Sequence, residues 1–268
     1  MSKKIYMKPP LSYYGGKQRL AKTILPLIPK HKLYVEPFFG GGAIFFAKEP
    51  SEAEVINDLN DNLITFYEVL KYDFDNLANM IDDTFSSEAL YKEAKNIYKN
   101  PTKYSDLEVA WSVWVQCNMS FATKILGGFA FSKSDKEPIK IFNKKTYFDT
   151  FKDRLKKTTI MSRDALDIIK RFDKEDAFFY IDPPYFNSEC GHYKGYTEDA
   201  FQNLLEQLQS IKGKFLLSSY PSEILSEYID KNKWYTHQKE HSIAVTHNTK
   251  KKKIEHFTAN YILEDSLT

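Results

Sequence analysis

An apolar segment at residues 177–181 runs directly into the sequence Asp182-Pro183-Pro184-Tyr185. Two consecutive prolines remove two backbone N–H donors and hold the chain extended, so the carbonyl groups here can point into a cleft instead of closing a turn. The Asp182 carboxylate and the Pro183 carbonyl could both accept hydrogen bonds from an exocyclic amino group, and Tyr185 offers a ring face on which a planar base can stack. A strand-ending turn with an exposed tyrosine is the alternative interpretation.

A second group of residues is typical of nucleotide binding. Gly40, Gly41 and Gly42 follow a predicted strand at 33–36 and allow the backbone to approach a ligand closely at the carboxyl edge of a sheet. Asp58 ends the next predicted strand, where its carboxylate could accept hydrogen bonds from two ribose hydroxyls. Together these residues predict a cofactor that contains adenosine. A plain structural turn at the glycines and a helix cap at Asp58 are the alternatives.

A third group lies near the start of the chain, where the sequence Ser-Tyr-Tyr-Gly-Gly-Lys at 12–17 places two aromatic residues and a lysine around a glycine turn. Gln18 follows the lysine, so the phosphate loop of nucleoside triphosphatases is not formed. The spaced glycine fingerprint of nicotinamide-dependent oxidoreductases is missing as well. Both of these enzyme classes are therefore disfavoured.

Hydrophobic periodicity predicts the elements that position these residues. Apolar stripes at helical spacing comprise Leu59, Leu63, Phe66, Tyr67 and Leu70, and then Phe201, Leu204, Leu205, Leu208 and Ile211. Strands are predicted at 33–36, 54–57, 159–161, 177–181, 214–218 and 255–263, with a helix over 43–47 after the glycines. Strands that alternate with helices predict an α/β fold with a parallel sheet.

The chain divides into a core and an insert. We expect a catalytic domain from residues 1–70 and 158–268, and an insert over 71–157 that is mainly helical and then irregular. Between residues 131 and 157 there are nine Lys or Arg against four acidic residues. This local excess indicates a surface for an anionic partner, although a solvated basic face is the simpler alternative.

Composition excludes several classes of protein. The 268 residues are 42% hydrophobic, and no apolar run approaches the length of a membrane span. A formal charge of +2 means that any nucleic-acid contact must come from local patches. Cys117 and Cys190 cannot build a disulfide framework, and the first ten residues lack a secretory signal, so we expect a reducing cytoplasm. Cys190 and His192 have no second pair at zinc spacing, and no metal site is predicted.

Four motifs, taken in order, resemble the Dam-type (class alpha) DNA adenine-N6 methyltransferase family. They are Tyr-Tyr-Gly-Gly-Lys at 13–17, Val-Glu-Pro-Phe-Phe-Gly-Gly-Gly at 35–42, Asn-Asp-Leu-Asn at 57–60 and Asp-Pro-Pro-Tyr at 182–185. The resemblance covers residues 11–262 except most of the insert. It implies a Rossmann-like S-adenosylmethionine-dependent methyltransferase sheet with an inserted, mainly helical target-recognition domain.

The resemblance also implies roles for individual residues, with S-adenosyl-L-methionine as the cofactor. Tyr13 stands where the family usually has a tryptophan. The implied catalytic residues are Asp182, Pro183, Pro184 and Tyr185. The implied cofactor-binding residues are Tyr13, Tyr14, Lys17, Glu36, Phe39, Gly40, Gly42, Asp58, Ser162 and Asp182.

The insert falls where the family places its target-recognition segment. It has no clear equivalent of the recognition hairpin of the GATC-recognising members, and residues 116–121 and 127–131 instead resemble restriction-associated or phage-borne members. The residues expected to contact DNA are Asn118, Ser120, Lys124, Lys133, Lys144, Lys145, Lys250 and Lys251.

The implied activity is site-specific transfer of a methyl group to the N6 amino group of an adenine flipped out of duplex DNA. Hydrogen bonds to Asp182 and the Pro183 carbonyl should localise the nitrogen lone pair and aim it at the methyl group. Methylation of RNA or of a protein amide, and a silent nucleic-acid-binding module, are the alternatives. We expect double-stranded DNA as the partner, in a restriction-modification or phage context. The protein is expected to be a monomer or weak dimer in the cytoplasm, without membrane contact. An endonuclease subunit is not expected to be required.

Overall fold

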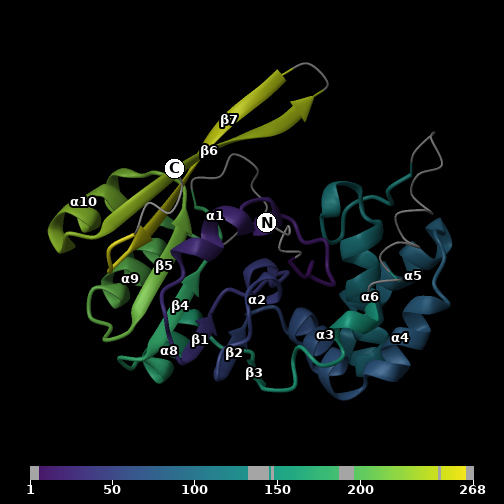
Figure 1. Cartoon of the computed structure of the whole chain (residues 1–268). Coiled ribbons are helices and arrows are strands. Elements are labelled where there is room, and N and C mark those ends of the chain that lie inside the picture. The colour runs from purple at the N-terminus through teal and green to yellow at the C-terminus, as the bar shows by residue number, and fades with distance from the viewer. Residues whose placement is uncertain (1–5, 132–144, 146–147, 187–195, 247–248, 264–268) are drawn as a thin grey trace, which may run out of the picture. The chain divides into compact units, whose positions relative to one another are not determined.

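The structure is a computed structural model that describes residues 6–131, 145, 148–186, 196–246 and 249–263 (Figure 1). The strands are β1 Leu33–Glu36, β2 Ala53–Asn57, β3 Thr158–Met161, β4 Ala177–Ile181, β5 Lys214–Ser219, β6 Tyr235–Thr246 and β7 Thr249–Ala259. The α-helices are α1 Ala21–Ile24, α2 Ala43–Ala47, α3 Asp61–Tyr72, α4 Phe74–Asp82, α5 Glu88–Lys99, α6 Asp106–Met119, α8 Ala165–Phe172, α9 Glu198–Leu208 and α10 Glu223–Asn232. Short 3-10 turns include Lys17–Arg19 and Phe121–Thr123.

The strands of the described chain form a seven-stranded sheet in the order β3-β2-β1-β4-β5-β7-β6. Strand β1 pairs in parallel with β2 and β4, and β4 pairs in parallel with β5. Every residue of β1 and β4 is buried, as expected where both faces of a parallel sheet are covered. Strand β7 enters antiparallel to β5 and β6. The predicted α/β, Rossmann-like fold is confirmed.

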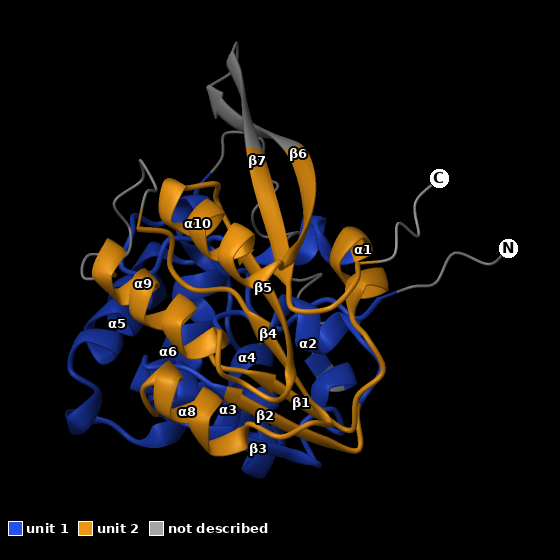
Figure 2. Cartoon of the chain, turned by 90° about the vertical axis from the view of Figure 1, so that its left-hand side faces the viewer, with its two compact units in different colours: residues 1–21, 39–50, 57–162 blue, residues 22–38, 51–56, 163–268 orange. Residues whose placement is uncertain are grey.

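Two compact units make up the chain, and Figure 2 colours them separately. Unit 1 comprises residues 1–21, 39–50 and 57–162, and unit 2 comprises residues 22–38, 51–56 and 163–268. These bounds differ from a division at residues 70 and 158, because α3 packs with the helices that follow it. The functional assignment of 71–157 to target recognition stays a prediction.

Unit 1 is organised around α6, which packs against α3, α4 and α5. The helix is buried from Val109 to Met119, so it forms the centre of this unit's core. Its start is fixed by a capping box, in which Ser105 and Glu108 each satisfy a backbone N–H of the other. Asn60 caps α3 and Ser87 caps α5 in the same way, by accepting a hydrogen bond from the third residue after it.

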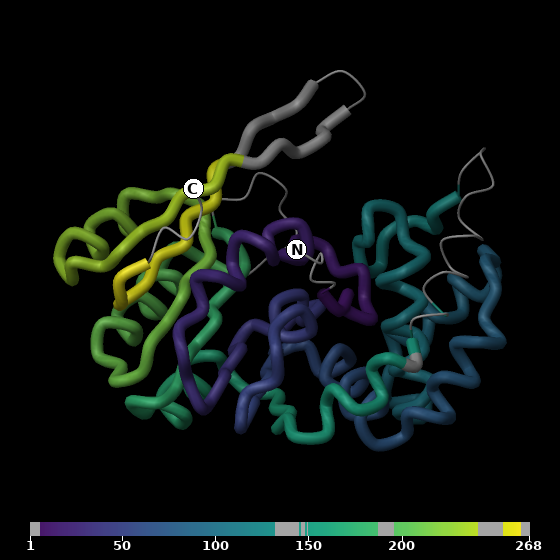
Figure 3. Tube along the Cα trace, viewed as in Figure 1, coloured from purple at the N-terminus to yellow at the C-terminus, as the bar shows by residue number. Residues whose placement is uncertain are grey.

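Unit 2 holds most of the sheet, with α9 in contact with both α8 and α10. Strands β1 and β4 are neighbours although they are far apart in the chain, as the purple and green segments of Figure 3 make visible. The β6–β7 hairpin extends beyond β5, because β5 pairs only with residues 256–259 of β7 (Figure 1). Beyond that point, β7 pairs with β6 alone.

The predicted elements agree closely with the observed ones at β1, α2 and β4. Three details differ. Leu59 is 74% exposed and precedes α3, and Ile211 follows the end of α9, so neither belongs to its predicted stripe. The closing strand starts earlier than predicted and ends at Ala259. Strand β6 was missed, because its polar sequence lacks the apolar run that marks a buried strand.

No helix in the described residues is long and apolar enough to cross a membrane.

Candidate active site

The glycine-turn cluster of unit 1 consists of Gly40–Gly42, Tyr13, Tyr67 and Asp58. Gly40 and Gly42 have φ values of +49° and +65°, which residues with a side chain rarely adopt. The Gly40 N–H donates to Oδ2 of Asp58 at 2.8 Å, and the Tyr67 hydroxyl donates to the Gly40 carbonyl at 3.0 Å. Both backbone polar groups of Gly40 are therefore held by side chains.

Tyr13 explains why glycine is needed in this turn. A Cβ on Gly41 would lie 2.6 Å from the Tyr13 Cβ, and a Cβ on Gly40 would lie 3.2 Å from its Cε1. At Gly42, a Cβ would lie 2.5 Å from Cζ of Phe39. The turn is thus packed from two sides, which fixes its conformation before any ligand binds.

Asp58 anchors the turn from the end of β2. Its Oδ1 accepts the Asn60 N–H at 3.0 Å, while Oδ2 accepts the Gly40 N–H. Burial raises the pKa of this carboxyl, and the hydrogen bonds from Asn60 and Gly40 counteract the rise. The cap of α3 is Asn60, so the alternative role of Asp58 as a helix cap is not observed. Each carboxylate oxygen can accept a further hydrogen bond, which fits a ribose diol.

Phe39 has a different position from the one expected of a cofactor contact. Its ring is 2% exposed and packs against Phe45 and Tyr67, with centroid distances of 5.4 and 4.7 Å. Its N–H donates to the Asn57 carbonyl, and its own carbonyl accepts the Gly42 N–H. Side chain and backbone of Phe39 both shape the glycine turn, and its contact with a cofactor stays a prediction.

Three further predicted cofactor residues also lie in unit 1. Lys17 is 8% exposed, and its ammonium donates to the Gly15 carbonyl at 3.3 Å. Tyr14, earlier in the same turn, is half-buried. Ser162 is exposed after β3, and its hydroxyl donates to Asp61 at the start of α3. Their contact with a cofactor stays a prediction.

In unit 2, the D-P-P-Y cluster, Asp182 to Tyr185, stands at the carboxyl end of β4. The Tyr185 hydroxyl lies 3.3 Å from Oδ1 of Asp182 and 3.3 Å from Oγ of Ser218. It also donates a short hydrogen bond to Oε1 of Glu255. Burial and then the charges of Asp182 and Glu255 raise the pKa of Tyr185 well above its ordinary value, so the phenol stays protonated.

The rings and prolines of this cluster differ in exposure. Pro183 is buried, whereas Pro184 and Tyr185 are half-buried. The Tyr185 ring meets Tyr220 edge-on, with centroids 4.4 Å apart. The strand-ending turn with a freely exposed tyrosine is therefore not what the structure contains, because the hydroxyl end of Tyr185 points into a polar network.

A buried carboxylate also ends β1, the parallel neighbour of β4. Glu36 is 2% exposed and accepts the Tyr34 hydroxyl at 2.7 Å. Burial, followed by the charges of Asp182 and Glu36, raises the pKa of Tyr180 well above its ordinary value. The carboxyl edge of β1 and β4 thus gathers acceptor oxygens, which suits a ligand that carries amino groups.

Sequence reasoning missed Ser218 and Glu255. The sequence pattern predicts only that Ser218 ends an apolar strand and that Glu255 belongs to the closing strand. A signal was present at Glu255, since an acidic residue in a predicted strand needs a partner wherever that strand is buried. The partner could not be identified, because it depends on the register between β5 and β7.

Two of the residues expected to contact DNA are buried. Asn118 is 8% exposed, accepts the Ser12 N–H at 3.2 Å and donates to the Pro10 carbonyl at 3.3 Å. Ser120 is 5% exposed. Asn118 therefore fastens the segment that precedes Tyr13 to the end of α6, and contact of either residue with DNA stays a prediction.

The structure describes only some of the lysines that are expected to contact DNA. Lys124 is exposed, and Lys145 donates to the Asp82 carbonyl. Lys133 and Lys144 lie outside the described residues, as do Cys190, His192 and the side chains of Lys250 and Lys251. Among the described residues, no group of three or more His, Cys, Asp or Glu could hold a metal ion.

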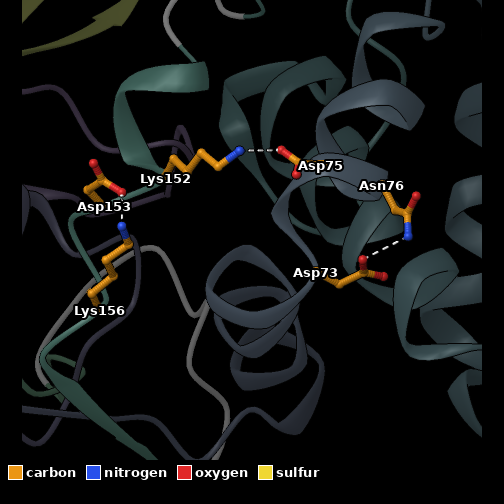
Figure 4. Close-up of polar contacts among 6 residues, drawn as sticks. All are labelled: Asp73, Asp75, Asn76, Lys152, Asp153 and Lys156. Carbon is orange, nitrogen blue, oxygen red and sulfur yellow. Dashed lines mark hydrogen bonds and ion pairs between the residues drawn. The ribbon is translucent and has the colours of Figure 1, made fainter.

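Part of the basic excess in the insert is neutralised. Lys152 pairs with Asp75 at 2.6 Å, and Lys156 pairs with Asp153 at 2.6 Å (Figure 4). Arg154 donates to the Phe45 carbonyl at 2.7 Å and lies over its ring. These three cations are therefore engaged within unit 1, which weakens the case for a uniformly DNA-facing basic surface.

The fold and these two clusters are typical of α/β enzymes that bind a nucleotide-containing cofactor at the carboxyl edge of the sheet. The features are a mainly parallel α/β sheet, a glycine turn after β1, an acidic residue after β2 and Asp-Pro-Pro-Tyr after β4. A family model for the D12 class N6 adenine-specific DNA methyltransferases matches residues 13–250. The chain belongs to this family, so it is a DNA adenine methyltransferase that uses S-adenosylmethionine.

Relatives that match over most of their length agree with this assignment. The type II methyltransferase M1.LlaDCHI of Lactococcus lactis subsp. cremoris is 29% identical over 249 residues, which cover 85% of this chain and 86% of the relative. The type II methyltransferase M.MjaIII of Methanocaldococcus jannaschii is 28% identical, covering 74% and 76%. The DNA adenine methylase of Salmonella typhi is 24% identical, covering 90% and 91%.

Proposed function

We propose that the two clusters divide the methyl transfer between them. The glycine-turn cluster, with Lys17, holds the cofactor, and the D-P-P-Y cluster holds the amino group of the target adenine. The observation that carries this proposal is the position of Asp182 and Pro183 at the carboxyl end of β4, the edge at which open α/β sheets bind ligands.

The residues of the glycine-turn cluster fit S-adenosylmethionine. The cofactor supplies a methyl group activated by a sulfonium centre. Asp58 would accept hydrogen bonds from the ribose hydroxyls with the acceptor capacity that its backbone amide contacts leave. The backbone of Gly40 allows close approach, and Tyr13, Tyr14, Glu36 and Ser162 complete the proposed set. No metal is needed for this binding.

The D-P-P-Y cluster would act on the adenine amino group. The Asp182 carboxylate and the Pro183 carbonyl accept its two N–H groups, which draws the nitrogen lone pair out of conjugation with the ring. Pro184 keeps the backbone extended, so that the Pro183 carbonyl keeps its direction. Tyr185 stacks against the base, which is flipped out of the duplex so that its amino group can be reached.

The surface proposed to read DNA is the loop 120–130 after α6, together with Lys124 and Lys145. Ala122, Thr123 and Leu126 have positive φ values in this loop, a conformation that costs free energy in residues with a Cβ. The loop presents Phe121, which is 73% exposed. A preorganised loop with an exposed aromatic residue suits contact with unstacked bases.

Side chains from α5 and α6 hold this loop. The Gly127 carbonyl accepts the Tyr91 hydroxyl at 3.0 Å and the Lys95 ammonium at 2.9 Å. Oε1 of Gln116 accepts the Leu126 N–H at 3.1 Å. These contacts offset the cost of the strained backbone, as expected for a segment whose shape matters for recognition.

The lysines at 133, 144, 250 and 251 remain proposed phosphate contacts.

The biological setting is proposed from the relatives. Two of them are type II methyltransferases, which supports a restriction-modification context, and a phage context is the alternative. The chain would act on DNA in the cytoplasm of a bacterial or phage-infected cell. We propose a monomer or weak dimer that does not need an endonuclease subunit for methylation.

The test is transfer of labelled methyl groups from S-adenosylmethionine to unmethylated genomic DNA, followed by nucleoside analysis and sequencing of the modified positions. Label in N6-methyladenine at one recurrent short sequence is the expected result. Label in RNA or in protein offered in parallel, without label in DNA, would overturn the substrate. Label in DNA without a recurrent sequence would overturn the proposed role of the loop in recognition.

A further inference from the structure

Glu255 occupies an unusual place in the sheet of unit 2. The last residue of β5 that pairs with β7 is Ser219, which lies opposite His256. The part of β7 before His256 pairs with β6 alone. Glu255, which directly precedes His256, is only 2% exposed. A carboxylate buried to this degree destabilises the fold unless hydrogen bonds or charges compensate it.

Two hydroxyl groups supply that compensation. Ser218 donates to Oε1 of Glu255 at 2.6 Å, and Tyr185 donates a short hydrogen bond to the same oxygen. Ser218 faces Phe257 in the register, so Glu255 is its diagonal neighbour across the strands. The strand pairing of β5 with β7 therefore places Glu255 against the D-P-P-Y cluster.

The Tyr185 hydroxyl has one proton and two carboxylates within reach. Oδ1 of Asp182 is 3.3 Å away, beyond the roughly 2.5–3.0 Å of an ordinary O–H···O hydrogen bond, whereas Oε1 of Glu255 accepts the hydroxyl. Ser218 gives its own proton to Glu255. The phenol proton thus goes to Glu255, and Asp182 is not the acceptor of this proton.

We propose that Glu255 is a positioning residue for methyl transfer. It fixes the Tyr185 ring through the hydroxyl, and it takes the phenol proton that would otherwise occupy an acceptor site of Asp182. The inference rests on the proposed roles of Asp182 and Tyr185 in holding the adenine.

The substitution E255Q tests this role, because it keeps the size of the side chain but removes its charge. The amide oxygen that remains is a weaker acceptor than the carboxylate, so the Tyr185 proton turns toward the charged Asp182. We expect kcat to fall by about tenfold or more, the size expected when a hydrogen bond to a charged partner is lost. The dissociation constant for S-adenosylmethionine should stay within about twofold, a readout that separates positioning from loss of the fold.

The decisive measurement is a double-mutant cycle with Y185F, which removes the hydroxyl but keeps the ring. If Glu255 acts through this hydroxyl, E255Q has no further effect on kcat in the Y185F background. A similar loss in both backgrounds would overturn the proposal, as would an E255Q enzyme with the kcat of the wild type. E240Q is the matched control, since Glu240 is an exposed acid on the same hairpin.

Thermal unfolding and calorimetric binding of S-adenosylmethionine verify that each variant is folded at the assay temperature. If E255Q is not folded, E255D replaces it, since it keeps the charge but withdraws the carboxylate from the Tyr185 hydroxyl. A fall in kcat that disappears in the Y185F background would again support the proposal, and a fall that persists there would overturn it. A wild-type protein that fails to methylate DNA would instead count against the proposed function.

Discussion

The backbone N–H of Gly40 donates a 2.8 Å hydrogen bond to Oδ2 of Asp58, so the proposed ribose-binding acid also holds the glycine turn in place. The turn and the carboxylate come from two different loops of unit 1, one after β1 and one after β2. The Asp58 side chain thus both holds the conformation of the glycine turn and supplies the proposed acceptor for the ribose hydroxyls. Its removal should disturb the turn and weaken cofactor binding.

We expect D58A to raise the dissociation constant for S-adenosylmethionine by about ten- to a hundredfold, because hydrogen bonds to a charged acceptor are lost. Isothermal titration calorimetry measures this change directly. E68A is the control, since Glu68 is exposed on α3, the helix that follows Asp58. Equal affinities for wild type and D58A would contradict the assignment.

The pKa of Asp58 gives two dependences on pH with opposite signs. Burial raises this pKa above its ordinary value. As pH rises from the ordinary to the raised value, the folded protein holds the proton that the unfolded chain has released, so the contribution of Asp58 to the free energy of unfolding decreases. Over the same window, affinity for S-adenosylmethionine should rise, because the ionised carboxylate is the better acceptor.

Urea unfolding and calorimetry from about pH 4 to about pH 8 test both trends by comparing wild type with D58N, which cannot ionise. The difference between wild type and D58N, both in the free energy of unfolding and in affinity for S-adenosylmethionine, should change as pH rises from the ordinary to the raised pKa of Asp58. Above the raised pKa, both differences should become independent of pH. Parallel curves for the two proteins would show that another group is responsible.

We expect D182A to lower kcat by about a hundredfold or more, the range found when one preorganised polar group is removed from a transition state. Binding of S-adenosylmethionine should remain measurable by calorimetry. D176N is the control, because Asp176 lies just before the opposite end of β4, where it pairs with Lys174. A D182A enzyme with full activity would refute the proposed role of this carboxylate.

The sequence allowed the parallel strands and both clusters to be predicted, because each depends on local pattern. Apolar runs mark β1 and β4, and the glycines and prolines that follow them have conformational effects that need no partner. The roles of Asn118 and Glu255 could not be predicted. Asn118 fastens a segment more than a hundred residues away, and Glu255 depends on strand register, so both follow from pairings at long range.

Gly42 offers a test of the turn itself. We expect G42A to lower the free energy of unfolding by about 1–3 kcal/mol or more, since the residue has a positive φ and its Cβ would meet the Phe39 ring at 2.5 Å. G128A is the matched control, because a Cβ there meets nothing within 4 Å. Chemical denaturation measures both variants, and equal stabilities would contradict the packing described for the turn.

Phe121 tests whether the loop 120–130 contacts DNA. Its ring is 73% exposed, so F121A should leave the melting temperature unchanged. If the ring stacks on a base, the KM for DNA should rise by about tenfold, since such a contact contributes about 1–3 kcal/mol. F85A is the matched control, with a 64% exposed phenylalanine elsewhere in unit 1. Because the two substitutions each remove a largely exposed phenylalanine ring, an equal change in KM would mean that general hydrophobic contact, and not the loop, accounts for the effect.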